Sequence, residues 1–86
     1  MNVVINVGFN NLVATDKINS IMDTNSAPTR RQISRLKEQE RVINATAGRA
    51  MKSAIFLRDG FVVLSALATS TLAQRMSDAA VEPSPE

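Results

Sequence analysis

The chain of 86 residues predicts a small α+β domain, in which a mainly antiparallel β-sheet is combined with one central helix and a short C-terminal helix. Short apolar and β-branched runs recur along the chain, separated by Gly, Asn and Asp residues that favour turns. Among them lies one stretch that starts with a capping serine and a proline and continues in good helix formers. A domain of this size buries only about 60% of its unfolded surface, which favours self-association.

The first elements expected are a β-hairpin and a further strand. Residues 3–7 and 12–14 are apolar and largely β-branched, and the segment 8–11 between them is rich in residues that accept positive φ. Residues 17–22 alternate in polarity before the polar segment 23–26, which is typical of a short strand that ends in a turn.

A helix is expected from Ser26 to Glu40. Ser26 is a good N-cap residue, and Pro28 falls in the first turn, where a missing N–H group costs nothing. The apolar stripe is thin and consists mainly of Ile33 and Leu36. Most of the helix surface is therefore expected to face solvent or a partner.

The remaining elements include a second hairpin. Residues 41–46 are a strand candidate followed by a turn at Gly48, and two apolar runs, 53–57 and 61–66, flank Arg58-Asp59-Gly60. Asp-Gly between two such runs is the strongest short-range hairpin signal.

The C-terminal part is expected to hold a short helix and a tail. Thr69 is predicted to cap a helix that runs to about Met76. We therefore expect a single domain at residues 1–76 and an acidic, proline-containing tail at residues 77–86 that is disordered.

Positive charge is concentrated in the middle of the chain. Between Arg30 and Arg58 there are eight Lys or Arg residues and two acids, although the formal net charge is only +2. Residues 1–77 carry ten bases and five acids, because three acids follow Arg75. Such a charge balance favours polyanionic partners.

Composition argues against an enzyme. The chain has no His, Cys, Trp or Tyr, and no glycine-rich nucleotide-binding motif follows any expected strand. Its Asp residues stand alone and are interpreted as turn and cap residues. We expect no catalytic residues, no cofactor, no metal site and no small-molecule substrate.

The apolar segments do not predict a membrane protein. The longest, at residues 61–73, is interrupted by Ser and Thr and is shorter than the roughly 20 apolar residues that a spanning helix needs. The N-terminus lacks the basic residues of a signal peptide. We expect a cytoplasmic protein without a membrane partner.

The first candidate binding element is the start of the expected helix. Arg30 and Arg31 lie in its first turn, where the helix dipole normally attracts acids, so a bound phosphate would explain their placement. Alternatively, the bases are the solvated face of a surface helix with local ion pairs to Glu38 and Glu40. The two interpretations are about equally supported by the segment alone.

The second candidate is the Gly48-Arg49 turn with Lys52, which could equally be a tight turn with solubilising charges; Lys17 is a weaker candidate. The three Phe residues, Phe9, Phe56 and Phe61, are expected in the core because their surroundings are apolar. Stacking on single-stranded bases is therefore poorly supported, and double-stranded DNA held through its backbone fits better.

Several segments resemble one protein family in the same order and at matching separations. They are Asn6–Val13, Ser26–Arg31, Ile43–Arg49, Val63–Ala66 and Thr71–Met76. From about Ile5 to Met76 the chain resembles the RemA family, the extracellular matrix regulatory proteins, which are small bacterial DNA-binding regulators.

The resemblance implies a transcription regulator that acts on biofilm matrix or osmoprotection genes. It also implies a ring-shaped homo-oligomer around which duplex DNA wraps, so that weak contacts repeat at high effective concentration. It implies a structural role for Pro28, and the glycines of the two loops, Gly8 and Gly48, are likewise expected to be structural.

The DNA contacts that the resemblance implies are Lys17, Arg30, Arg31 and the Gly48-Arg49 element, with Lys52 as the next available base. The chain departs from the family at Ala50, where a second Arg is usual. This departure leaves open an alternative, a structural or protein-interaction ring with reduced or lost DNA binding. RNA binding is a third possibility.

Overall fold

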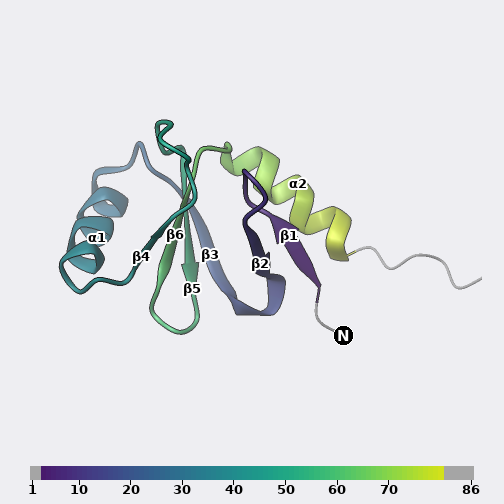
Figure 1. Cartoon of the computed structure of the whole chain (residues 1–86), viewed down its shortest axis with the longest axis horizontal. Coiled ribbons are helices and arrows are strands. Elements are labelled where there is room, and N and C mark those ends of the chain that lie inside the picture. The colour runs from purple at the N-terminus through teal and green to yellow at the C-terminus, as the bar shows by residue number, and fades with distance from the viewer. Residues whose placement is uncertain (1–2, 81–86) are drawn as a thin grey trace, which may run out of the picture.

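A computed structural model describes residues 3–80 of the chain (Figure 1). The elements are, in order, β1 (Val4–Asn6), β2 (Leu12–Ala14), the 3-10 helix η1 (Thr15–Lys17), β3 (Ile18–Asp23), α1 (Ala27–Glu38), β4 (Val42–Asn44), β5 (Ser53–Leu57), β6 (Val62–Ser65) and α2 (Thr69–Ala80). Both predicted hairpins, β1–β2 and β5–β6, are confirmed.

The strands form two sheets. β1 and β2 pair with each other, and the other strands form a four-stranded sheet in the order β3-β5-β6-β4. All pairs are antiparallel except β4 and β6, which run parallel. The prediction of a mainly antiparallel α+β fold is therefore confirmed, with one parallel pair that it did not include.

The four-stranded sheet lies between two different layers. Figure 1 shows α1 against one face of the sheet, and the β1–β2 hairpin with α2 on the other side. The expectation that the first helix is central is wrong, because the sheet occupies the middle and α1 is an outer layer. Its thin apolar stripe is sufficient for this place, since only one side of α1 is covered.

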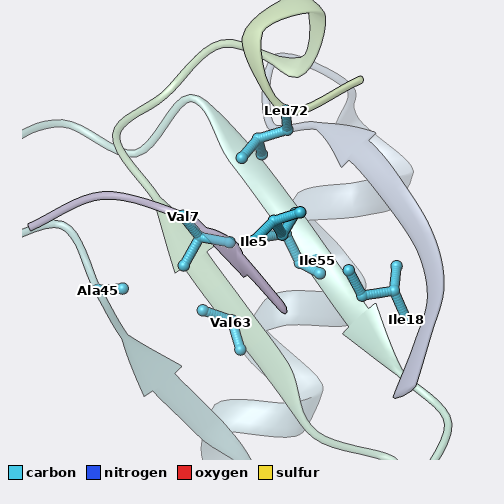
Figure 2. Packing of buried hydrophobic residues seen from close by; sticks show 7 residues of the cluster. All are labelled: Ile5, Val7, Ile18, Ala45, Ile55, Val63 and Leu72. Carbon is cyan, nitrogen blue, oxygen red and sulfur yellow. The ribbon is translucent and has the colours of Figure 1, made fainter. Parts of the chain in front are cut away.

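Each face of the sheet has its own hydrophobic core. Figure 2 shows the larger one, in which Ile55 and Val63 of the sheet meet residues of the hairpin and of α2. Its buried members are Ile5, Val7, Ile18, Ala45, Ile55, Val63 and Leu72. On the α1 side the buried members are Ile33, Ala54, Val62 and Leu64. The alternation of side chains along β5 and β6 thus supplies both cores.

The hairpin is attached to the sheet and to α2 through two backbone carbonyls, one in the last residue of β1 and one in the residue that follows it. The Ser65 hydroxyl, which is fully buried, donates to the Val7 carbonyl at 2.7 Å, and the Arg75 Nη1 group donates to the Asn6 carbonyl at 2.6 Å. The Ser65 oxygen also accepts from the Leu67 N–H group at 3.0 Å. One buried hydroxyl therefore connects β6, the hairpin and the segment before α2.

Helix α1 ends two residues before the expected end at Glu40. Its C-terminus is closed by hydrogen bonds from the Arg41 N–H group to the Leu36 carbonyl at 2.9 Å and from the Glu40 N–H group to the Lys37 carbonyl at 3.0 Å. Glu40 adopts a φ of 57°, the left-handed conformation that this type of helix end requires. The good helix formers in the sequence continue to Glu40, two residues beyond the last helical residue, so the predicted end was too late.

Helix α2 is longer than expected. The Leu72 N–H group bonds to the Ala68 carbonyl at 3.1 Å, so the capping position is Ala68 and not the predicted Thr69. The helix continues to Ala80, four residues beyond the expected end at Met76. The remainder of the expected tail, residues 81–86, lies outside the described residues.

Strand direction places the connections at two opposite ends of the domain. The turn between β1 and β2, the segments leading into α1 and α2, and the loop between β4 and β5 lie at one end, the top in Figure 1. We call this the upper end. Helix η1, the α1–β4 connection and the β5–β6 turn lie at the lower end.

Replacing Ser65 with Ala is expected to lower the free energy of unfolding by about 1–3 kcal/mol, because the buried Val7 carbonyl and Leu67 N–H group lose their partner. Urea denaturation at a fixed protein concentration measures the change. Ser77→Ala, on an exposed position of α2, is the matched control. Equal stability of the two variants would contradict the proposed attachment of the hairpin.

Candidate functional site

Bases outnumber acids at the upper end of the domain. The bases there are Arg30, Arg31, Arg49 and Lys52, and the one acid among the described residues of that end is Asp23. All of the basic side chains are exposed. The lower end carries Lys17, Lys37, Arg41 and Arg58 together with Asp16, Glu38, Glu40 and Asp59. Outside both ends lie Arg35, Arg75 and Asp78 in the helices, so most of the excess positive charge of the described residues is at the upper end.

The first turn of α1 supplies two of the upper bases. Helix formation begins with the Arg30 N–H group bonding to the Ser26 carbonyl at 3.1 Å, and Pro28 lies exposed within this turn as expected. Ser26 occupies the N-cap position, but its side chain makes no capping hydrogen bond. No acid lies in the first turn. Because free N–H groups remain there beside two guanidinium groups, the turn is electrostatically suited to an anion.

Along α1 the two arginines continue into a longer basic strip. A shallow hollow on the helix surface is lined by Ala27, Arg30, Arg31, Ser34, Arg35 and Glu38. Arg31 and Arg35 lie one turn apart, where like charges disfavour the isolated helix. A negatively charged partner in this hollow would remove that repulsion.

The β4–β5 loop presents Arg49 on a fixed backbone. The Asn44 side-chain oxygen accepts bonds from the Thr46 N–H group at 2.9 Å and from its hydroxyl at 2.7 Å. Ala47 and Gly48 then adopt φ values of 53° and 83°, and the Arg49 N–H group bonds to the Thr46 carbonyl at 3.0 Å. The predicted turn at Gly48 is confirmed.

An aromatic ring supports the Arg49 side chain. The guanidinium carbon of Arg49 lies 5.2 Å from the centre of the Phe9 ring, which is 49% exposed. The expectation that Phe9 fills the core is wrong, because positive φ values at Gly8, Phe9 and Asn10 turn this side chain outward. The sequence analysis did not predict a functional role for Phe9. Its position in a polar turn between two apolar runs was a sign that its side chain could be exposed.

The other two Phe residues are partly buried. Phe56 packs beside the core on the α1 side, and Phe61 lies under the guanidinium group of Arg41 at 5.8 Å. Arg41 also donates to the Asp59 carbonyl at 3.4 Å. This second arginine–aromatic pair lies at the lower end and fastens the β5–β6 turn to the start of β4.

Lys52 lies close to the segment that leads into α1. The Thr24 N–H group bonds to the Lys52 carbonyl at 3.2 Å, and the Thr24 hydroxyl bonds to the Met51 carbonyl at 3.1 Å. Asp23 and Lys52 line one shallow hollow, so the carboxylate offsets part of the lysine charge. The remaining loop position, Ala50, is exposed and uncharged.

Lys17 is separated from the other predicted contacts. It ends η1 at the lower end, where its carbonyl accepts a bond from the Arg58 N–H group at 2.8 Å. Its side chain lines a groove with the exposed apolar residues Leu12 and Ile43. The other four predicted bases therefore lie at one end of a single subunit, and Lys17 lies at the opposite end.

Residues 3–80 were predicted to hold neither a metal site nor a membrane-spanning segment. No group of three or more potential metal-binding side chains occurs in this part of the chain. No helix in it combines the length and the apolar character that crossing a membrane requires. Asp23 and Asp59 accept turn hydrogen bonds from Asn25 and Phe61, as predicted for isolated Asp residues.

Comparison with known proteins gives a consistent result. Residues 4–76 match the family described as RemA-like, extracellular matrix regulatory protein A-like. A protein of Coprothermobacter proteolyticus named for a regulatory role is 42% identical over 86% of this chain and 70% of its own length. Relatives with similar names from Synechococcus elongatus and Dictyoglomus turgidum are 39% and 40% identical, each over 84% of this chain and over 83% and 85% of their own length.

Replacing Gly48 with Ala is expected to lower the free energy of unfolding by about 1 kcal/mol, because only the backbone conformation disfavours a Cβ atom there. Nothing lies within 4 Å of the position that the Cβ atom would take, so no clash contributes. Gly48→Asn should cost less, since Asn tolerates positive φ. Equal destabilisation by both substitutions in thermal melts would contradict this explanation.

Proposed function

Because the chain belongs to the RemA-like family of regulatory proteins, we propose that it regulates transcription by binding double-stranded DNA. In this proposal Arg30, Arg31, Arg49 and Lys52 contact the DNA backbone. The protein acts in the cytoplasm as a ring-shaped homo-oligomer. The description of the family as extracellular matrix regulators favours biofilm matrix genes as targets.

The observation that carries the proposal is the separation of charge between the two ends of the domain. At the upper end bases outnumber acids, whereas at the lower end bases and acids are balanced. Solvation alone would require no such separation, because scattered charges keep a surface soluble equally well. A surface that binds the phosphates of a DNA backbone has a higher affinity when its bases are gathered at one end.

The shape of the upper end favours backbone contacts over base reading. Its bases come from a helix N-terminus and from loops, and within residues 3–80 no helix projects from it to enter a groove (Figure 1). Phosphate contacts fix position on the duplex without reading sequence. Preference among sites would then come from how easily the DNA bends around the assembly.

Assembly into a ring is supported by the outer strands of the four-stranded sheet. β3 and β4 lie at opposite edges of that sheet, and each carries an exposed apolar side chain, Met22 at 43% and Ile43 at 46%. Two different adhesive edges on one subunit suit a head-to-tail contact, which closes into a ring when the rotation allows.

A second candidate is a protein-interaction ring with reduced DNA binding. Ala50 favours it, because this exposed position lacks the second Arg and leaves Arg49 as the sole base of residues 45–51. Binding to a partner protein through a largely apolar contact would depend weakly on salt. Binding to DNA would weaken linearly in the logarithm of salt concentration. Titration of a duplex at several salt concentrations separates the two.

Replacing Arg49 with Ala is expected to weaken duplex binding and to reduce the salt slope by about 0.9 for each phosphate that is no longer neutralised. Fluorescence anisotropy with a labelled duplex at several salt concentrations measures both quantities. Arg58→Ala is the matched control, since it removes the same charge at the lower end. If both variants behave alike, the upper end is not the DNA-binding surface.

Glu substitutions at Ile43 and at Met22 are each expected to yield monomers, because each places a charge in an apolar contact. Mass photometry or analytical ultracentrifugation measures the mass. In a head-to-tail contact each variant keeps one intact edge, so an equimolar mixture should form dimers. Failure of the mixture to associate, or wild-type protein that is itself monomeric, would contradict this arrangement.

A further inference from the structure

We infer that Phe9 is a positioning residue for Arg49, holding its guanidinium group in the orientation in which it meets phosphate. The inference rests on the proposed DNA binding and adds a residue outside the set of bases. Its basis is the contact of 5.2 Å between the Arg49 guanidinium carbon and the centre of the Phe9 ring. The two residues belong to turns that are far apart in the sequence.

The backbone conformation of Phe9 is energetically unfavourable for a non-glycine residue and requires an explanation. Phe9 has a φ of 53°, which costs a non-glycine residue free energy, and its ring remains 49% exposed. The ring therefore gains little from burial in exchange for this strain. What it does gain is the contact with Arg49, which explains an outward-facing Phe at this position.

The turn that carries Phe9 is held from several sides. The Val7 N–H group bonds to the Asn11 carbonyl at 2.8 Å, and the Asn11 N–H group bonds to the Gly8 carbonyl at 3.0 Å. The Asn6 side chain accepts from the Gly8 N–H group at 2.7 Å. The Asn11 amide donates to the Gly8 carbonyl at 2.8 Å. The ring is thus displayed on a fixed backbone.

Both turns are built by the same device. Asn6 is the last residue of β1 and Asn44 is the last residue of β4, and the side-chain oxygen of each accepts a hydrogen bond from the N–H group two residues later. These bonds fix the start of each turn before the backbone enters positive φ. Consequently the backbones that carry Phe9 and Arg49 are both fixed, and the two residues lose little conformational freedom when a ligand binds.

Stacking on the ring leaves the Arg49 donors available. The guanidinium group is planar, and its N–H bonds point outward in that plane, so a ring against one face does not compete with a phosphate at the edge. A lysine at this position would keep the charge but lose both the stacking and the two-pronged hydrogen bonding. Arginine therefore suits this position better than lysine, although both residues can place a cation over the ring.

The test compares Phe9→Leu and Phe9→Trp with the unchanged protein, using duplex affinity at several salt concentrations. Phe9→Leu removes the ring and is expected to weaken binding by about two- to fivefold for each subunit in contact with the DNA. Its salt slope should stay unchanged, because the number of positive charges is the same. Phe9→Trp should bind the duplex at least as tightly as the unchanged protein, since Trp is the best aromatic partner for a cation.

A double-mutant cycle shows whether the effect acts through Arg49. Adding Phe9→Leu to Arg49→Ala should weaken binding no further than Arg49→Ala alone, because the cation that the ring contacts is already absent. Additive effects would overturn the inference. So would quenching of the Phe9→Trp fluorescence by DNA, which would indicate that the ring stacks on bases itself; the natural chain has no Trp.

The outcomes distinguish this inference from the proposed function. If Arg49→Ala reduces affinity and Phe9→Leu does not, DNA binding stands and the positioning role of Phe9 is wrong. If neither Arg49→Ala nor Phe9→Leu changes the affinity, the upper end is not the DNA-binding surface and both proposals fail. Oligomer mass and urea midpoint, measured for every variant, show that the comparison is made between folded assemblies.

Discussion

Much of this structure depends on how the N-terminal hairpin is fastened to the rest of the domain. β1 and β2 form a separate sheet, so no ladder of hydrogen bonds sets the position of the hairpin over the larger sheet. Apolar packing around Val7 and two hydrogen bonds, from Ser65 and Arg75, do so instead. Because these bonds are made at the very end of β1, they determine where the following turn begins, and hence where Phe9 meets Arg49.

The central strands serve two cores, which limits what they can contain. β5 and β6 consist of small or β-branched residues except for Phe56, Leu57 and Leu64, and Ser53 and Ser65 place hydroxyl groups where the segment before α2 needs partners. The Ser53 hydroxyl donates to the Leu67 carbonyl at 2.6 Å. These buried polar groups are all satisfied within the described residues, since no buried side-chain N or O atom there lacks a partner. The polar contacts therefore fix the layers without leaving a desolvated group unpaired.

Local chemistry made most elements predictable, whereas their arrangement was not. Both hairpins follow from turn residues placed between apolar runs, such as Asp59-Gly60, and these signals act over a few residues. The place of α1 on the outside of the sheet depends on which face of β5 and β6 meets Ile33, a long-range choice. The end of α1 was predicted too late because Glu40 adopts a conformation that usually belongs to glycine.

The candidate site was predictable in its charges but not in its geometry. Runs of bases are visible in any sequence, but whether they share a surface depends on strand direction, which sets Lys17 apart from the rest. Phe9 was assigned to the core because its surroundings in the sequence are largely apolar. Its exposure results from positive φ in its own turn and from the proximity of a loop distant in the chain, neither of which the residue type reveals.

The excess of positive charge at one end gives each subunit an electric dipole moment along its strands. Near a polyanion, this moment exerts a torque that turns the subunit before any contact is made. When subunits are related by rotation about one axis, only the components of their moments along that axis add up, and the others cancel. The tilt of the strands relative to the axis therefore decides where a closed assembly carries its positive potential, on one flat face or around its rim. Only a potential around the rim would hold a polyanion that encircles the assembly.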